Sequence, residues 1–419
     1  MKLGILTIGN ELTSGRTQDT NSSLISREMT TQGWQVTVMM SVGDRAEAIK
    51  DALNFIMAKA DAILVTGGLG PTADDITTAC IAKAFSLELV PDEQALLHIK
   101  GLFEKFRLKW TDNNAKQAIF PAGAEPLRNP VGTAWGFSLR VGEKMIIVIP
   151  GVPAEVKRML PEGVIPLLRT SFPQEAPCIE TSTFKLFGLA EALVDSALTD
   201  VDFDSLGVAV GFYPNFPENH LVLTARGTSA EETRERIRQA GAEVEDRLAP
   251  HIFARGEETI EGSVASRLTE KGLTIALGES CTGGLIADRL TNIPGSSSFF
   301  DRAAIVYSNR SKTEMLGVPE EIIRKFGAVS PETARLMASG VRQAGGTDLG
   351  LAVTGIAGPA GGTAEKPVGT AFIALADQAG TVTRSFAFRW DRRRNKIIAS
   401  QAALMLLNEY LKGETCHDE

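Results

Sequence analysis

The chain has 419 residues, of which 43% are hydrophobic and 22% charged, and it carries a formal net charge of −8. This length indicates two or three soluble globular domains, and the acidic balance argues against a general binder of nucleic acid or of membrane surfaces. No run approaches the ~18 apolar residues of a membrane-spanning helix, and the first residues are typical of a strand and not of a signal peptide. The four cysteines are dispersed, which argues against structural zinc, and we expect a cytoplasmic protein.

Residues 1 to about 165 alternate between strand and helix patterns. Apolar runs that end in glycine or in turn residues predict strands at 3–9, 34–42, 61–66 and 144–149. Helical patterns near 22–32 and 45–59 separate the first three of them. This rhythm indicates a parallel or mixed sheet with helices on both faces, so we expect a first α/β domain over residues 1–168.

The pattern changes after residue 170, where strand-like runs and a charged helix indicate a small α+β module over residues 169–256. The helix at 229–248 opens with Ser229 and acidic residues, which suit a helix N-terminus. A second α/β domain is predicted over residues 257–415, and its first strand is LTIAL at 273–277.

That strand leads into GESCTGG, residues 278–284, which sets Ser280, Cys281 and Thr282 side by side. Ligands gather at the carboxyl ends of strands in α/β sheets, and we expect Gly283 and Gly284 to open a helix. The unpaired N–H groups of a helix start would stabilise an alkoxide, a thiolate or a phosphate. A histidine, the usual partner of such a nucleophile, is missing from the surrounding sequence. The alternative that Ser280 only caps the helix stays open.

Two further strands of this domain carry candidate groups. The strand AAIVY ends in Tyr307 and continues to Lys312, and a desolvated lysine can replace histidine as general base. The strand LGLAVT leads into GIAGPAGGT at 355–363, whose glycines can wrap an anion with backbone N–H groups. Arg392 in WDRRRNK is a candidate phosphate contact. Taken singly, each of these features is also typical of an ordinary surface residue or turn.

The N-terminal domain has two informative segments. IGNELTSGRTQDTN at 8–21 offers Glu11, Asp19 and Asn21, and VTGGLGPTADD at 65–75 offers a glycine turn followed by Asp74 and Asp75. A glycine turn before a helix suits a phosphate, and adjacent carboxylates are oxygen ligands suited to a divalent ion. Acidic residues matched to a helix dipole are the alternative interpretation.

Several motifs of the C-terminal domain occur together and in order. GESCTGG, VYSNRSK, GAVSPETA, VTGIAGPAGGTAEKPVGT and the WDRRR segment resemble the C-terminal domain of the CinA family. The resemblance implies an amidohydrolase that needs no cofactor and converts nicotinamide mononucleotide and water to nicotinic acid mononucleotide and ammonia. It implies Ser280 as the nucleophile, Lys312 as general base and Tyr307 as an auxiliary group, with helix N–H groups stabilising the oxyanion. The residues implied in substrate binding are Thr282, Gly283, Gly284, Thr354, Gly355, Gly358, Gly361, Gly362, Thr363 and Arg392. Two alternative mechanisms can be weighed on the same residues. Cys281 stays open as an alternative nucleophile. A metal-dependent deamidase is disfavoured, because the sequence between 258 and 415 contains no histidine.

The N-terminal motifs, with NNAKQAIFP, NPVGTAWGF and IPGVPAEV, resemble the N-terminal domain of the same family, which is related to the molybdopterin-binding fold. The resemblance implies an ADP-ribose pyrophosphatase that uses a divalent ion, Mg, Mn or Co. Glu11, Asp19, Asp74 and Asp75 are the metal-ligand candidates. The other ligand-binding candidates are Asn21, Thr66, Gly67, Gly68, Gly70, Lys116 and Glu155.

The middle module resembles the KH-type domain of full-length family members. It lacks the GXXG loop with which KH domains clamp a nucleic-acid backbone, so we expect a spacer and oligomerisation element in a homodimer. The function that the resemblance implies is pyridine-nucleotide salvage. The main alternative is a non-catalytic nucleotide or pterin-binding protein that acts in competence or the DNA-damage response. A molybdenum-cofactor enzyme is a third option.

Overall fold

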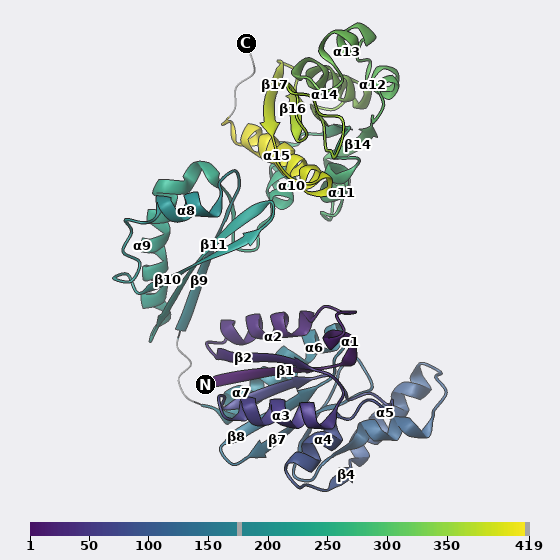
Figure 1. Ribbon diagram of the computed structural model, residues 1–419, viewed down its shortest axis with the longest axis vertical. Coiled ribbons are helices and arrows are strands. Elements are labelled where there is room, and N and C mark those ends of the chain that lie inside the picture. The colour runs from purple at the N-terminus through teal and green to yellow at the C-terminus, as the bar shows by residue number, and fades with distance from the viewer. Residues whose placement is uncertain (174–177, 415–419) are drawn as a thin grey trace. The chain divides into compact units, whose positions relative to one another are not determined.

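The computed structural model describes residues 1–173 and 178–414. Residue 415, the last of the third predicted domain, and Cys416 lie outside the described residues. The chain forms two compact units, one of Met1–Ile179 with Arg226–Thr233 and the other of Glu180–Ala225 with Arg234–Glu419 (Figure 1). Across the described ranges, no helix has the length and apolar character needed to cross a membrane.

A six-stranded sheet in the order β2-β1-β3-β8-β7-β6 forms the centre of the N-terminal domain. Its strands are β1 (Lys2–Ile8), β2 (Gln35–Val42), β3 (Ala62–Thr66), β6 (Glu125–Leu127), β7 (Gly136–Val141) and β8 (Lys144–Ile149). The first four strands in that order are parallel, and β7 and β6 are antiparallel additions, so the sheet is mixed. Two short strands, β4 (Leu89–Pro91) and β5 (Ile119–Pro121), pair separately.

Helices cover both faces of this sheet, as the alternating pattern predicts. One face packs against α3 (Ala46–Met57), α4 (Thr77–Ala84) and α5 (Glu93–Lys105). The other packs against α2 (Thr20–Thr31), α6 (Pro153–Met159) and α7 (Ile165–Ser171). The short helix α1 (Asn10–Thr13) follows β1 directly, and the glycine turn after β3 leads toward α4. The two predicted ligand segments therefore leave adjacent strands at the same edge of the sheet.

The middle domain is a four-stranded sheet in the order β10-β11-β9-β12, with two helices against one face. Its elements are β9 (Cys178–Leu186), α8 (Glu191–Ala197), β10 (Val208–Asn215), β11 (Glu218–Gly227), α9 (Ala230–Leu248) and β12 (Ile252–Arg255). Ser229 Oγ accepts the N–H of Glu232 at 3.2 Å, which confirms the predicted start of the charged helix.

The C-terminal domain has a five-stranded sheet in the order β14-β13-β15-β16-β17. Its strands are β13 (Ile275–Glu279), β14 (Phe300–Ile305), β15 (Leu349–Gly355), β16 (Thr370–Ala376) and β17 (Thr381–Ala387). The first three strands in the sheet order are parallel, and β16 and β17 are antiparallel. The carboxyl ends of β13, β14 and β15 therefore meet at one edge, where the predicted motifs begin.

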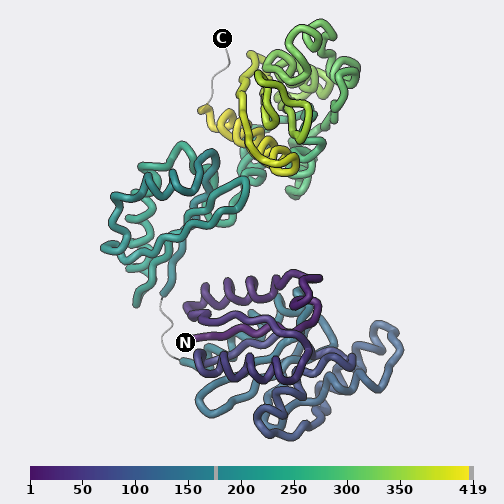
Figure 2. Tube along the Cα trace, viewed as in Figure 1, coloured from purple at the N-terminus to yellow at the C-terminus, as the bar shows by residue number. Residues whose placement is uncertain are grey.

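Each face of this sheet is covered by three helices. One core contains α10 (Ile260–Lys271), α11 (Leu285–Thr291) and α15 (Arg392–Lys412), and Figure 2 shows α15 in yellow beside the strands of this domain. The opposite core contains α12 (Asn309–Leu316), α13 (Glu320–Phe326) and α14 (Pro331–Gly345).

Candidate functional site

Ser280 and Lys312 meet at the carboxyl edge of the C-terminal sheet. Lys312 Nζ donates to Ser280 Oγ at 3.0 Å and to the carbonyl oxygen of Val306 at 2.8 Å. Both side chains are buried, with exposed fractions of 6% for Ser280 and 1% for Lys312. Burial lowers the pKa of the Lys312 ammonium group, because the low-dielectric surroundings disfavour its charged form. A neutral amine in this position can accept the serine proton.

The helix α12 holds Lys312 in place. Ser308 and Ser311 form a reciprocal capping box at its start, and Ser308 Oγ accepts the N–H of Ser311 at 3.0 Å. Lys312 lies one turn into this helix, whereas the sequence analysis placed it between the strand and the helix. β14 ends at Ile305, so Tyr307 is not its last residue but stands beyond it with 60% of its surface exposed.

The start of α11 differs from the expectation. The carboxylate of Glu279, which is completely buried, accepts the N–H groups of Gly284 at 2.9 Å, Ile286 at 3.2 Å and Ala287 at 2.8 Å. These three N–H groups are therefore occupied, and for them the prediction that they stabilise an oxyanion is wrong. The helix begins at Leu285 after Gly284, so Ser280 does not cap it either.

Cys281 lies in the wall of the same site with 7% of its surface exposed. Burial raises the pKa of its thiol to about 12, so the thiolate that a cysteine nucleophile needs is disfavoured. Its Sγ lies 3.0 Å from the position that a Cβ on Gly355 would occupy, and the carbonyl oxygen of Thr370 lies 2.9 Å from that position. Only glycine fits at residue 355 without displacing these neighbours.

A cavity of about 230 Å³ opens beside the Ser280–Lys312 pair. The predicted residues that line it are Ser280, Tyr307, Lys312, Thr354, Gly355, Gly358, Gly361 and Arg392. Five predicted substrate-binding residues are not part of its lining: Thr282, Gly283, Gly284, Gly362 and Thr363. Thr282 is fully buried, and the Thr363 hydroxyl accepts the N–H of Lys366 at 3.1 Å within its own loop.

Arg392, the first residue of α15, closes one side of this cavity. It donates to the phenolic oxygen of Tyr307 and to the carbonyl oxygen of Gly358, both at 2.6 Å. Thr354 Oγ1 donates to the carbonyl oxygen of Ala328 at 2.7 Å, which ties the third strand to the loop before α14. The cavity is thus lined by both the Arg392 guanidinium group and the buried Ser280 hydroxyl.

Sequence reasoning missed two polar residues of this region. Asn309 lines the cavity two positions after Tyr307, inside the VYSNRSK motif that was already under consideration. Glu279 immediately precedes Ser280, but a carboxylate at the end of a buried strand has no sequence pattern that identifies it as a helix cap.

A second cavity, of about 580 Å³, lies at the carboxyl edge of the N-terminal sheet. The predicted residues that line it are Glu11, Gly67, Gly68, Gly70, Asp74, Asp75 and Glu155. Asp44, which the sequence analysis missed, lines it as well. Burial raises the pKa of Asp44, and repulsion from Glu11, Asp74 and Asp75 acts in the same direction. These carboxyl groups therefore form one acidic wall.

The carboxylates of Asp74 and Asp75 both accept hydrogen bonds from Thr72. Asp75 accepts the Thr72 N–H at 2.8 Å and its hydroxyl at 2.6 Å, and Asp74 also accepts from that hydroxyl. Lys116 Nζ donates to the carbonyl oxygen of Thr72 at 2.7 Å, so Lys116 supports this turn. Glu155 accepts from Asn129 at 2.9 Å, and burial raises the pKa of its carboxyl group.

Three other predicted residues have structural roles in this domain. Asp19 caps α2 through the Ser22 N–H at 2.9 Å, and its carboxylate also accepts from Thr7 Oγ1 at 2.9 Å. Thr66 donates to the carbonyl oxygen of Pro150 at 2.7 Å, and Asn21 donates to that of Gly151 at 2.7 Å. None of the three is among the cavity-lining residues, and we therefore remove Asp19 from the metal-ligand candidates.

The acidic wall does not form a metal centre. Within residues 1–173 and 178–414, no three or more His, Cys, Asp or Glu side chains are grouped so that they could hold a metal ion. Asp74 and Asp75 are not free to bind a metal ion, because both carboxylates already accept hydrogen bonds from Thr72. The predicted set of Glu11, Asp19, Asp74 and Asp75 is therefore not a preformed site for a divalent ion among the described residues.

Three family profiles match successive parts of the sequence. They are described as "Probable molybdopterin binding domain" over residues 4–170, "Damage-inducible protein CinA KH domain" over 181–254, and "CinA C-terminal domain" over 257–411. The chain is 58% identical to a CinA-like protein of Syntrophus aciditrophicus and 43% identical to one of Geotalea uraniireducens. In both comparisons 98% of each chain is covered. The solved structure of the competence/damage inducible protein CihA from Agrobacterium tumefaciens is 40% identical, covers 36% of this chain and 95% of that chain, and has a TM-score of 0.35.

The fold and the two cavities define a class: a mixed α/β protein with a molybdopterin-binding-like first domain, a KH-like middle domain and a C-terminal α/β domain that contains a buried serine–lysine pair. Full-length identity with the named relatives then decides the family. The chain belongs to the CinA family.

Proposed function

We propose that the C-terminal domain hydrolyses the amide of nicotinamide mononucleotide to nicotinic acid mononucleotide and ammonia. The observation that carries the proposal is the 3.0 Å contact between Lys312 Nζ and Ser280 Oγ in a buried site. A serine needs a base to become a nucleophile, and a lysine whose pKa is lowered by burial supplies one without histidine or metal.

The chemistry balances with these two residues and one water molecule. Ser280 Oγ attacks the amide carbonyl carbon while its proton passes to Lys312 Nζ. The tetrahedral intermediate then breaks its C–N bond, and Lys312 returns the proton to the leaving ammonia. Water, activated by the same amine, attacks the acyl ester and releases the carboxylate and Ser280.

The oxyanion of this intermediate needs a donor other than the start of α11. Across the described part of the chain, the N–H of Cys281 makes no hydrogen bond with another residue. The N–H next after a nucleophilic serine is an oxyanion donor in other hydrolases. We assign that role to the Cys281 N–H.

The rim of the cavity suits the phosphate of the substrate. Arg392 brings a guanidinium group to the opening, and arginine is well matched to phosphate oxygens. In the resting protein its donors are engaged by Tyr307 and Gly358, which keep the side chain at the rim.

The direct experiment measures ammonia release from nicotinamide mononucleotide by the purified chain in the presence of EDTA. Nicotinamide riboside, which lacks the phosphate, is the matched control substrate. We expect ammonia from the mononucleotide and a much lower kcat/KM for the riboside. If the folded chain releases no ammonia, the alternative of a non-catalytic nucleotide or pterin-binding protein in competence or DNA damage is favoured. Tight molybdopterin binding would instead favour the third option, a molybdenum-cofactor enzyme.

A second activity is proposed for the N-terminal cavity: hydrolysis of ADP-ribose to AMP and ribose 5-phosphate. The observation that favours it is the size of the cavity, about 580 Å³, with a glycine turn beside the acidic wall. Because a diphosphate is repelled by these carboxylates, we expect that a cation must accompany it. AMP formation is therefore measured with Mg, Mn, Co or EDTA, and equal rates in all four would contradict the cation requirement.

The homodimer and the cytoplasmic location stay predictions. Sedimentation of the purified chain decides the oligomeric state.

A further inference from the structure

The loop between β10 and β11 of the middle domain contacts the segment that begins α15. The rings of Phe216 and Trp390 meet edge to face, with centroids 5.2 Å apart and an angle of 73° between their planes. The guanidinium carbon of Arg394 lies 5.4 Å from the Phe216 ring centroid and 5.2 Å from that of Trp390. These three side chains form an aromatic clasp, defined as Phe216, Trp390 and Arg394.

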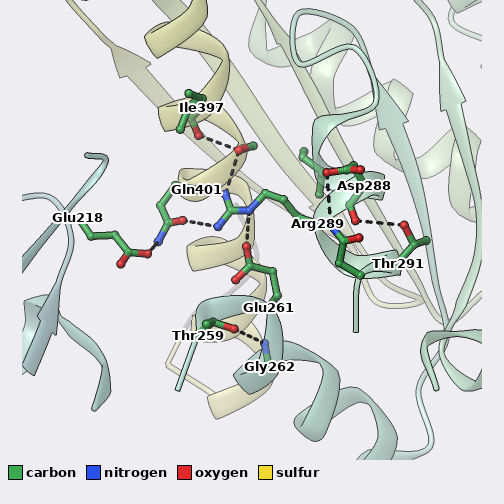
Figure 3. Close-up of polar contacts among 12 residues, drawn as sticks. Glu218, Thr259, Glu261, Gly262, Asp288, Arg289, Thr291, Ile397 and Gln401 are labelled. Carbon is green, nitrogen blue, oxygen red and sulfur yellow. Dashed lines mark hydrogen bonds and ion pairs between the residues drawn. The ribbon is translucent and has the colours of Figure 1, made fainter. Parts of the chain in front are cut away.

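A polar contact joins the same hairpin to α15 about two turns further along the helix. Gln401 of α15 donates to Glu218, the first residue of β11, at 3.1 Å. Figure 3 shows Gln401 between Glu218 and Arg289. Arg289 of α11 donates to Gln401 at 2.5 Å, to Ser400 at 2.9 Å, and to Glu261 of α10.

Most side chains of this hydrogen-bond network are shielded from water. Gln401 is completely buried, and the ion pair of Arg289 with Glu261 has side chains exposed by only 16% and 17%. Buried pairs of this kind are screened less than surface pairs and keep a defined geometry. The hairpin is therefore bonded to α15 through a residue that is itself hydrogen-bonded to α11.

Arg392 occupies the middle of the segment that the clasp holds. Trp390 and Arg394 stand two positions before and after it and contact Phe216, whereas Arg392 itself contacts Tyr307 and Gly358 in the candidate active site. The first turn of a helix lacks the full set of backbone bonds and frays unless side chains hold it. Asp391 caps this turn by accepting the Arg394 N–H at 3.0 Å.

We infer that Phe216 of the middle domain is a positioning residue for the C-terminal site: through Trp390 and Arg394 it keeps Arg392 directed at the anionic group of the substrate. This inference rests on the proposed function for the nature of the substrate. It assigns to the KH-type domain the role of setting substrate affinity. A flexible arginine loses side-chain entropy when it binds an anion, and pre-ordering the segment reduces that loss.

The test uses the full chain with Phe216→Ala, and Tyr213→Ala as the matched control. Tyr213 is an aromatic residue of the same hairpin, with 59% of its surface exposed. The first readout is hydrogen exchange of the peptide spanning residues 389–398. We expect faster exchange in Phe216→Ala and no change in Tyr213→Ala. Unchanged exchange in Phe216→Ala overturns the inference, and it does so whether or not the protein turns over nicotinamide mononucleotide.

The second readout is substrate affinity. We expect Phe216→Ala to raise KM for nicotinamide mononucleotide about three- to tenfold, the range of a lost aromatic pair, with kcat changed little. The same rise is expected in Kd measured by calorimetry on Ser280→Ala. In an Arg392→Ala background Phe216→Ala should add nothing, because the residue that it positions is gone. A full additive effect there contradicts the inference.

The experiments distinguish failure of the proposed function from failure of the positioning role of Phe216. If the chain neither binds nor hydrolyses the mononucleotide, the proposed function fails, and the exchange rates alone decide whether Phe216 orders the start of α15. If the mononucleotide is hydrolysed but Phe216→Ala behaves as Tyr213→Ala does, the positioning role fails and the proposed function stands.

Discussion

Lys312 is the residue on which the proposed chemistry depends most. Lys312 is 1% exposed, and among the described residues its amine bonds to the Ser280 hydroxyl and the Val306 carbonyl oxygen and to no carboxylate. Burying an ammonium group without a counter-ion costs free energy, so burial favours the neutral amine over the charged form. This cost is what turns an ordinary lysine into a base.

The pH dependence of the rate follows from that shift. Below its pKa in the folded protein, Lys312 is protonated and cannot accept the serine proton; above it, the amine is free. Because burial lowers that pKa, we expect kcat/KM to rise with pH through a midpoint below the ~10.4 of an exposed lysine. Steady-state rates from about pH 6 to 10 measure it. A midpoint at the ordinary lysine value would contradict the assigned base.

Where a motif fixed the spacing, the residues that the sequence singled out lie together in the structure. One cavity is lined by four such residues. Ser280 follows β13, Tyr307 and Lys312 follow β14, and Arg392 begins α15. Asp44 was missed because it stands in a loop without a motif, and its proximity to Glu11 arises only from the fold. Asp19 was assigned to metal because a carboxylate in a polar segment is equally typical of a ligand and of a helix cap.

At the scale of elements, α11 shows how the protein builds the turn after Ser280. This helix has seven residues, and the N–H groups at its start point to a buried carboxylate from the preceding strand. Hydrogen bonds to a charged acceptor are stronger than neutral ones. Glu279 thus fixes the chain on both sides of Ser280 and Cys281.

We expect Glu279→Gln to weaken this turn. The amide replaces one acceptor oxygen by an NH₂ group, which meets a backbone N–H of α11 and leaves it without a partner. The free energy of unfolding should fall by about 1–3 kcal/mol, and kcat should fall about ten- to a hundredfold because the nucleophile is displaced. Urea unfolding and steady-state kinetics measure the two effects.

Glu321→Gln, on the exposed surface of α13, is the matched control and should change neither quantity. Loss of stability without loss of kcat would show that Glu279 supports the fold and does not position Ser280.

Element order was easier to predict than strand direction. The apolar runs predicted β1, β2, β3, β8, β13 and β15 close to their observed bounds. The antiparallel strands β7, β16 and β17 were not assigned, because a strand's direction depends on which neighbour it pairs with and not on its own side chains. The parallel strands alone were enough to locate the two sheet edges at which the cavities lie.

At the scale of the whole molecule, the two cavities belong to different domains and have opposite character. The N-terminal cavity is lined by carboxylates, and the C-terminal one has an arginine at its rim and a lysine beside the serine. The two proposed reactions therefore need different conditions: EDTA should leave ammonia release unchanged while it lowers AMP formation from ADP-ribose. Inhibition of both reactions by EDTA would contradict this separation.

The proposed positioning role would give the middle domain a part in substrate binding. A KH-type fold without the nucleic-acid loop looks like a spacer in sequence, and the contact of Phe216 with Trp390 depends on residues 174 positions apart in the chain. No local pattern predicts such a pair. Only the fold shows that the hairpin adjoins the segment that carries Arg392.

The serine–lysine mechanism is tested most directly by ammonia release from nicotinamide mononucleotide in three variants of the full chain. We predict that Ser280→Ala loses all activity above background, that Lys312→Met loses about 10²- to 10⁴-fold, and that Cys281→Ala keeps most of it. Circular dichroism and thermal unfolding confirm that each variant is folded. Loss of activity in Cys281→Ala with activity retained in Ser280→Ala would contradict the account, because the nucleophile would then be the thiol and not the hydroxyl that Lys312 contacts.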